Sequence, residues 1–297
     1  MKVWLVQMQA KVNDKEANLI KILDYINQGV TSGANLIVFP ELVLTGYVRA
    51  NYYELAEPIP GPATDKVANL IRGKHTYVVF GMPEVREGTM YNATPMIGPN
   101  GVVAVPRKVY LASFTSPTML KTTEPERVYF KPSESCVVCD TEFGKIGVLI
   151  CFDLYFPEVA RSLALQGAWL ILQPTASPIR KVGEMLESIT FLTKTRALEN
   201  LVYFAWINNC GEQEGVSLMG GTHIMDPVPG KSTVNMLKVA SVYDLEKGEH
   251  AKEEVVECEI DSGSIFKLRH YYPMLREVRP DILEKLYKIA KQVQFNE

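Results

Sequence analysis

Short, almost wholly apolar runs recur along this 297-residue chain. Three of them are ANLIVFPE (34–41), GKIGVLI (144–150) and LVYFAWIN (201–208). Runs of this length and composition are typical of strands that are covered on both faces. Segments with helical spacing lie between them, and alternating strands and helices predict an α/β fold.

Helical spacing is clearest in three segments. Apolar residues fall three and four positions apart within 19–26, and Asn13, with a glutamate three residues later, is expected to cap that helix. Residues 157–168, which begin with a proline, and residues 185–199 are also predicted to be helices.

Residues 1–297 are expected to form one domain, because no linker, repeat or low-complexity stretch divides the chain. The tail, about 262–297, is different. It contains an aromatic-rich stretch with little periodicity, and then an amphipathic helix that begins at Pro280. We expect this tail to cross onto a partner subunit.

Composition excludes several classes of partner. The formal net charge of −3 gives no basic excess, so we expect no nucleic-acid partner. No run of 18 apolar residues occurs and residues 1–10 lack the features of a signal peptide, so we expect no membrane partner. Five cysteines, an odd number, in a chain of this length favour a reducing cytoplasmic location.

Three residues that carry chemistry follow predicted strands: Glu41, Lys108 and Cys151. In α/β sheets, functional groups gather outside the carboxyl ends of the strands. A thiol, a carboxylate and an ammonium group suffice for covalent acyl transfer: the thiol attacks, the carboxylate moves the proton and the lysine stabilises the oxyanion. Lys108 would also favour the thiolate form of Cys151.

Each of these residues also has an ordinary interpretation. A cysteine among apolar neighbours is usually a core residue, and a lone glutamate or lysine after a strand is usually solvated. Spacing alone leaves both interpretations open.

The sequence resembles the nitrilase superfamily of carbon–nitrogen hydrolases in three ordered segments. They are IVFPELVLTGY, PRKVYL and GVLICFDLYFPEVARSLALQGAWLIL. Later segments, TKTRALENLVYFAWINNCG, MGGTHIMDPVPGK and MLREVRPDIL, are also similar. The resemblance covers nearly the whole chain and implies a four-layer α-β-β-α sandwich. It also implies a homodimer or higher homo-oligomer, with the C-terminal tail crossing to the partner.

The resemblance implies a Glu-Lys-Cys triad in which Glu41 is the base, Lys108 the catalytic lysine and Cys151 the nucleophile. The backbone N–H of Phe152 would belong to the oxyanion hole. A second, supporting glutamate would be Glu126, with Glu124 as the rival. No cofactor and no metal are expected.

The implied reaction is hydrolysis of a non-peptide carbon–nitrogen bond in a small amide, through a thioester on Cys151. The triplet Cys-Phe-Asp at 151–153 favours an amide substrate over a nitrile. A nitrilase and an N-carbamoyl amidohydrolase are the alternatives among enzymes. A non-catalytic binding or scaffold protein on the same fold is the rival from another class. A thiol enzyme of the Cys-His type is a further alternative, although none of the four histidines stands at a catalytic position of the family.

Two positions depart from the family pattern. Tyr110 stands where many members have histidine, so it either packs or reshapes the site, and His223 stands where serine is common and is given no catalytic role.

Cys136 and Cys139 form a C-x-x-C pair, which we interpret as two ordinary strand cysteines on opposite faces. The pocket walls are expected from loops 47–55, 112–127 and 175–186, where Arg180 and Lys181 could attract a carboxylate or be merely solvated.

Overall fold

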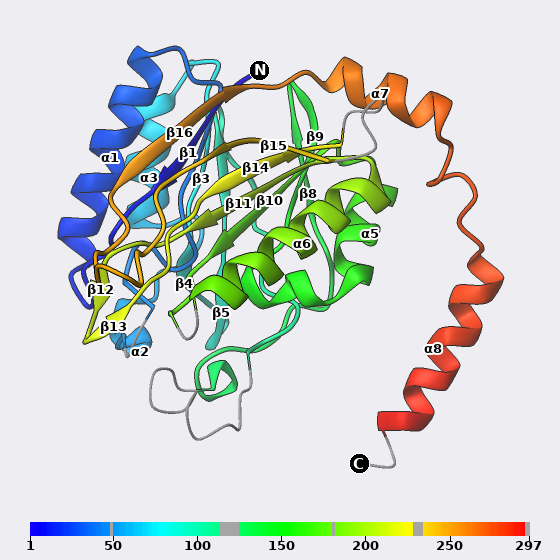
Figure 1. Ribbon diagram of the computed structural model, residues 1–297. Helices are drawn as coiled ribbons and strands as arrows, with labels where there is room; N and C mark the ends of the chain where they lie inside the picture. Colours follow the sequence, from blue (N-terminus) through cyan, green and yellow to red (C-terminus); the bar gives the residue numbers. More distant parts are fainter. Residues whose placement is uncertain (48–49, 113–124, 180–181, 228–233, 295–297) are drawn as a thin grey trace.

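The computed structural model describes residues 1–47, 50–112, 125–179, 182–227 and 234–294 (Figure 1). Its centre is a pair of six-stranded sheets. The first has the order β16-β1-β2-β3-β6-β7 and the second the order β15-β14-β11-β10-β9-β8.

The first sheet mixes parallel and antiparallel neighbours: β1 is parallel to β2 and antiparallel to β16. Its strands are β16 (Glu254–Glu259), β1 (Lys2–Gln7), β2 (Leu36–Val38), β3 (Tyr77–Val79), β6 (Met96–Gly98) and β7 (Gly101–Ala104).

The second sheet has β10 parallel to both β9 and β11, with antiparallel strands at its edges. Its strands are β15 (Asn235–Val239), β14 (His223–Asp226), β11 (Tyr203–Asn208), β10 (Leu170–Thr175), β9 (Gly144–Val148) and β8 (Val138–Thr141).

Helices cover the outer face of each sheet, as Figure 1 shows. Helices α1 (Lys15–Thr31) and α3 (Pro62–Ile71) pack on the first sheet, and α5 (Pro157–Leu165) and α6 (Val182–Asn200) pack on the second. One core lies between the two sheets and one lies under each pair of helices. The four-layer α-β-β-α sandwich is therefore confirmed.

Strand β1 explains why the apolar runs are nearly continuous. Val3 and Leu5 belong to the core between the sheets, whereas Trp4 and Val6 belong to the core beneath α1 and α3. Side chains alternate between the two faces of a strand, so a strand with a core on each side needs apolar residues at every position.

Shorter elements complete the chain. They are α2 (Tyr52–Leu55), the β4–β5 hairpin (Met82–Arg86 and Thr89–Ala93), the 3-10 turns η1 (Glu126–Val128) and η2 (Cys151–Tyr155), the β12–β13 pair (Glu212–Gln213 and Val216–Ser217), α7 (Ser262–Tyr271) and α8 (Pro280–Gln294).

The predicted cap of the first helix was wrong by one residue. Asp14 is the N-cap of α1, and its carboxylate accepts a hydrogen bond from the Ala17 backbone N–H at 3.1 Å. Asn13 instead has a positive φ of 62° and accepts a hydrogen bond from the Asn51 backbone N–H at 2.7 Å. Both residue types cap helices well, so the sequence did not separate them.

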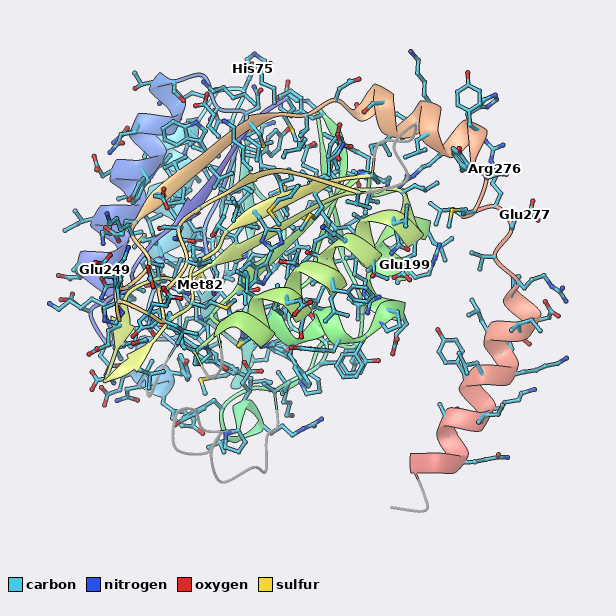
Figure 2. All side chains as sticks on the ribbon, in the orientation of Figure 1. His75, Met82, Glu199, Glu249, Arg276 and Glu277 are labelled. Atoms are coloured by element: carbon cyan, nitrogen blue, oxygen red, sulfur yellow. The ribbon has the colours of Figure 1, made fainter. Side chains whose placement is uncertain are left out.

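Helix α8 extends away from the body of the molecule (Figures 1 and 2). Ile282, Leu286 and Ile289, spaced as one face of the helix, have 51%, 55% and 57% of their surface exposed. Within the described part of the chain, no helix is both long and apolar enough to cross a membrane.

Candidate active site

Four residues that the sequence singles out lie close together, and three of them come just after the ends of strands. Glu41 follows β2, Lys108 follows β7, Glu126 begins η1 and Cys151 begins η2 just after β9. Lys108 Nζ lies 2.7 Å from Glu41 Oε1 and 2.6 Å from Glu126 Oε1. These three side chains are buried, so the lysine is held between two carboxylates away from bulk water.

The β4–β5 hairpin and the second sheet fix the orientation of Glu41. Its Oε1 accepts a hydrogen bond from Asn92 Nδ2 at 2.8 Å, and its Oε2 accepts one from the Ala176 backbone N–H at 2.9 Å. Asn92 belongs to β5, while Ala176 follows β10 of the second sheet. Its backbone carbonyl accepts a third bond, from Asn209 Nδ2 at 3.0 Å. The carboxylate is thus positioned before any substrate arrives.

The charges of Lys108 and Glu126 depend on each other. Burial by itself would lower the pKa of Lys108, but Glu126 and Glu41 raise that pKa well above its ordinary value. Burial raises the pKa of Glu126, and Lys108 opposes that rise. The second oxygen of Glu126 accepts a hydrogen bond from the Ala112 backbone N–H at 2.8 Å. Lys108 is therefore a fixed positive charge in this site.

Cys151 sits at a sharp turn between strand and helix. Its φ of 46° is in the left-handed region, which is uncommon for a residue with a side chain and is often found at functional sites. Gln173 Nε2 donates a hydrogen bond to the Cys151 carbonyl at 2.9 Å. The turn and this bond fix the direction in which the thiol projects.

The thiol of Cys151 is protonated in the free site. Burial and the Glu41 carboxylate raise its pKa well above the ordinary value, and the effect of Lys108 in the opposite direction is smaller. Lys108 favours the thiolate, as expected, but burial and Glu41 outweigh its effect on the pKa of Cys151. A thiol of this kind needs a base to remove its proton.

Asp153 joins the lysine segment to the cysteine segment. Its carboxylate accepts hydrogen bonds from the backbone N–H groups of Tyr110 at 2.7 Å and Ile150 at 2.9 Å. Burial raises the pKa of Asp153 to about 7. Sequence reasoning missed this residue, although its place two positions after the cysteine in a buried run was a signal.

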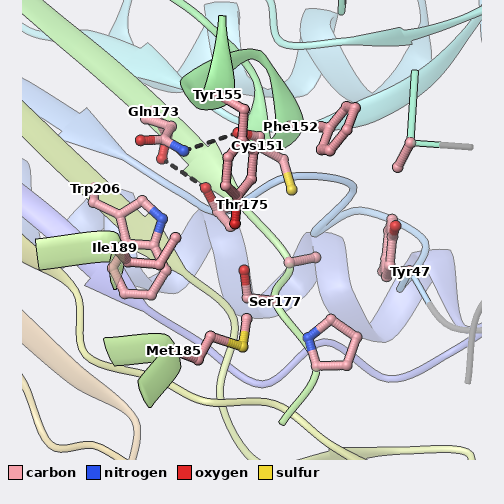
Figure 3. A pocket seen from close by; sticks show the side chains of 13 residues that line it. Tyr47, Cys151, Phe152, Tyr155, Gln173, Thr175, Ser177, Met185, Ile189 and Trp206 are labelled. Carbon is pink, nitrogen blue, oxygen red and sulfur yellow. Dashed lines mark hydrogen bonds between the residues drawn. The ribbon is translucent and has the colours of Figure 1, made fainter. Parts of the chain in front are cut away.

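A cavity of about 60 Å³ opens in front of Cys151 (Figure 3). Each of the three predicted loops contributes to its lining. Tyr47 comes from loop 47–55, Ala112 from loop 112–127, and residues 175–178 from loop 175–186. Sequence reasoning missed the contributions of regular elements, which come from Gln173 on β10, Trp206 on β11 and Ile189 on α6. The full described lining is Tyr47, Ala112, Cys151, Phe152, Tyr155, Gln173, Thr175, Ala176, Ser177, Pro178, Met185, Ile189 and Trp206.

The two departures from the family pattern are both packing residues. The Tyr110 ring stacks on Phe156 with centroids 3.5 Å apart, and its hydroxyl donates to Glu158 at 2.9 Å. His223 is fully buried on β14, where Nδ1 lies 2.8 Å from the Gly221 carbonyl. Neither residue lines the cavity.

The remaining candidates lie elsewhere. Cys139 belongs to the core between the sheets, whereas Cys136 packs against the core under α5 and α6, so the two thiols face different layers. Glu124, Arg180 and Lys181 lie outside the described residues. Within the described ranges, no group of three or more His, Cys, Asp or Glu side chains could hold a metal ion.

Comparison with known proteins agrees with this geometry. The family model described as carbon-nitrogen hydrolase matches residues 2–228. A probable nitrilase of Schizosaccharomyces pombe is 32% identical over 95% of this chain and 96% of its own. An omega-amidase of Mus musculus is 27% identical over 94% of this chain and 95% of its own.

Solved structures share the fold. A member of the nitrilase superfamily from Saccharomyces cerevisiae superposes with a TM-score of 0.75 at 25% identity, over 92% of this chain and 94% of its own. An amidase from Nesterenkonia sp. superposes with a TM-score of 0.72 at 22% identity, over 96% of each chain. The sequence matches, which span most of the chain, show that this protein belongs to the carbon-nitrogen hydrolase family, whose members hydrolyse non-peptide C–N bonds.

Proposed function

We propose that this protein is an amidase that hydrolyses a small amide through a thioester on Cys151. The observation that carries the proposal is the buried Lys108 held between Glu41 and Glu126, beside a cysteine at a strained turn. A cysteine that only fills the core would have no reason to adopt a left-handed backbone conformation or to lie beside buried charged side chains.

The first half of the reaction forms the thioester. Glu41 takes the proton of the Cys151 thiol as the sulfur attacks the amide carbonyl carbon. Lys108 Nζ and the Phe152 backbone N–H stabilise the oxyanion of the tetrahedral intermediate. Glu41 then gives its proton to the nitrogen, the C–N bond breaks, and ammonia or an amine leaves.

The second half releases the acid. Water loses a proton to Glu41 and attacks the thioester carbonyl, and the second tetrahedral intermediate collapses. The C–S bond breaks, the proton returns to Cys151, and a carboxylic acid departs. Glu126 holds Lys108 in place through both halves and does not itself exchange protons with the substrate.

The test is ammonia release across a panel of simple amides, N-carbamoyl compounds and nitriles. Wild type should release ammonia from an amide, and Cys151→Ala should reduce the rate by at least ~10³-fold. Cys258→Ala, which removes a buried core cysteine of β16, is the matched control and should keep the activity. Activity retained by Cys151→Ala would contradict the mechanism.

A nitrilase is the second candidate, because the relative from Schizosaccharomyces pombe carries that name. Attack of Cys151 on a nitrile carbon would give a thioimidate, which water converts to acid and ammonia through the same thioester. An N-carbamoyl amidohydrolase would use the same residues. The same panel separates the three, since each predicts a different substrate class.

We also propose that the protein works as a homodimer or higher homo-oligomer in the cytoplasm. The exposed apolar face of α8 supports pairing with a second copy, because such a face normally contacts a partner. In this proposal residues 1 to about 261 form the body of the single domain and the tail crosses to the partner. All five cysteines are free thiols, which suits a reducing compartment.

A further inference from the structure

The two oxygens of the Glu41 carboxylate have different surroundings. Oε1 accepts hydrogen bonds from Lys108 Nζ at 2.7 Å and from Asn92 Nδ2 at 2.8 Å. Oε2 accepts a hydrogen bond from the Ala176 backbone N–H at 2.9 Å. An ionised carboxylate has about four acceptor sites, two on each oxygen. Both sites of Oε1 are therefore occupied, whereas one site of Oε2 has no partner among the described residues.

Oε2 is also the oxygen on the side of the nucleophile. Burial and Glu41 raise the pKa of the Cys151 thiol, and a hydrogen bond from the same Ala176 N–H lowers that pKa. One backbone N–H thus contacts both Oε2 and the sulfur. The sulfur therefore lies near Oε2, whereas Oε1 is directed toward Lys108 and Asn92.

These contacts give the two oxygens different tasks. We propose that Glu41 transfers the proton through Oε2 alone, and that Asn92 is the positioning residue that keeps Oε1 out of the transfer. The S–H bond of Cys151 breaks as an O–H bond forms at Oε2, and the same proton then moves from Oε2 to the leaving nitrogen. This inference deepens the proposed function and rests on it.

Asn92 is placed where it can hold both the base and the lysine. It lies on β5, is fully buried, and is not among the described residues that line the cavity. Its backbone carbonyl accepts a hydrogen bond from the Lys108 backbone N–H at 2.9 Å, while its side chain holds Glu41. Its amide oxygen cannot replace the nitrogen in that contact, because two acceptors would then face each other. Asn92 therefore positions both groups from outside the cavity.

The direction of the effect on kcat separates the two oxygens. If Oε1 carried the proton, the Asn92 amide would compete for the same oxygen, and removing the amide would leave kcat unchanged or raise it. If Oε2 carries the proton, removing the amide frees the carboxylate to turn away from the sulfur, and kcat falls. A displacement of about 1 Å at a catalytic group can lower the rate by roughly 100-fold.

The experiment measures kcat and KM for the substrate of the ammonia-release panel that wild type converts fastest. Asn92→Leu has a side chain of similar size without a donor. We expect its kcat to fall roughly 100-fold and its KM to stay within about 3-fold of wild type, because Asn92 lies outside the described cavity lining.

Thr94→Val is the matched control. Thr94 is also fully buried, two residues later in the chain, and its hydroxyl has no hydrogen-bond partner among the described residues. This variant replaces a buried polar group with an apolar one of the same shape and touches neither oxygen of Glu41. It should keep both kinetic constants within about 3-fold of wild type.

A crystal structure of Asn92→Leu tests the positioning without any substrate. We expect the Glu41 carboxylate to have turned, so that the distance from Oε2 to the Ala176 backbone nitrogen exceeds the limit of about 3.5 Å for a hydrogen bond. Circular dichroism and thermal melting show whether each variant is folded. Asn92→Ala, which also lacks the donor and adds no bulk, takes the place of Asn92→Leu if that variant does not fold.

An unchanged or higher kcat in the folded Asn92 variant would overturn the inference, as would a Glu41 carboxylate that keeps its bond to Ala176. Equal losses in the Asn92 variant and Thr94→Val would also overturn it, because the loss would then follow from packing. The proposed function is judged separately: wild type without Cys151-dependent ammonia release sinks it, while the crystal structure still decides the positioning of Glu41. Cys151-dependent turnover that is undiminished in Asn92→Leu would sink this inference alone.

Discussion

Lys108 is the residue that balances the charges of the site. It is fully enclosed and lies within hydrogen-bond distance of two buried carboxylates, Glu41 and Glu126. Removing one partner of a buried ionic group is far more costly than removing a surface pair, because the charge left behind is neither solvated nor paired. The lysine is thus structural as well as catalytic in our proposal.

We predict that Lys108→Met is inactive and destabilised by roughly 3–5 kcal/mol at neutral pH. Burial already raises the pKa of Glu126, and without the ammonium that opposes this rise the folded-state pKa of Glu126 lies further above its unfolded value. Stability is then retained at low pH and lost as pH rises through the folded pKa of Glu126. Urea unfolding at several pH values should show Lys108→Met recovering toward wild type on acidification.

The double variant Lys108→Met/Glu126→Gln is the control for that explanation. It removes one carboxylate together with the lysine, and should be more stable at neutral pH than Lys108→Met alone. If the single variant matched wild type in stability at neutral pH, the account of the buried charges would be wrong.

The buried imidazole of His223 makes the stability of the protein depend on pH. Burial lowers its pKa to about 4, so the imidazole stays neutral in the folded protein. The unfolded chain binds a proton near pH 6.5, so this stability is present above that pH and is lost as pH falls toward 4. Between pH 7 and pH 5 the loss from this group is about 2 kcal/mol.

We therefore expect His223→Gln to lose about 2 kcal/mol less stability than wild type between those two pH values, although it is less stable overall. Urea unfolding at each pH measures the difference. His75→Gln, at an exposed position on the outside of the molecule (Figure 2), is the surface control. A His223→Gln slope equal to that of wild type would show that this histidine does not titrate as proposed.

At the scale of secondary-structure elements, the position of Glu41 depends on a close backbone contact with the segment that follows β3. Gly81 lies just after β3, and a Cβ there would come within 2.2 Å of the Leu42 nitrogen and 2.7 Å of the Glu41 Cα. The atoms in the way are backbone, which cannot swing aside as a side-chain end can. The position of Glu41 therefore depends on a glycine forty residues later in the chain.

We predict that Gly81→Ala lowers kcat/KM by roughly 100-fold, because a displacement near 1 Å of a catalytic group has about that effect. Gly29→Ala is the matched control. A Cβ at Gly29 would meet the end of the Ile37 side chain at 2.5 Å, in the core beneath α1 and away from the cavity. It should change the melting temperature and leave kcat/KM within about 3-fold; equal activity losses in both variants would contradict the prediction.

The sequence predicted the elements better than the cavity. Strands covered on both faces leave a strong pattern, so β2, β9, β10 and β11 appear where apolar runs occur. Glu41, Lys108 and Cys151 could be picked out because strand ends mark where chemistry gathers. Gln173 and Trp206 could not be, since a residue inside a strand is assigned to a cavity only once the neighbouring strand and helix are placed.

At the scale of the whole molecule, the C-terminal tail exposes apolar side chains that no other part of the described chain covers. Helix α8 turns its apolar face to solvent and stands apart from the body (Figure 2). An amphipathic pattern predicted this helix correctly, but no pattern within one chain says what covers it.

We predict that the native protein is a homodimer or larger and that replacing Ile282, Leu286 and Ile289 with serine reduces its mass in sedimentation equilibrium. The body should stay folded, because these side chains are more than half exposed in the single chain. Replacing Lys285, Lys288 and Lys291 with serine, on the same helix, is the control and should keep the mass. A wild-type monomer would contradict the proposed role of the tail.

The central claim is that Cys151 carries the acyl group. The most direct measurement is the intact mass of the enzyme quenched during turnover of an amide substrate, followed by peptide mapping. We predict a mass increase equal to the acyl group, located on Cys151 and absent from Cys151→Ala. An adduct on any other residue, or turnover by Cys151→Ala, would contradict the account.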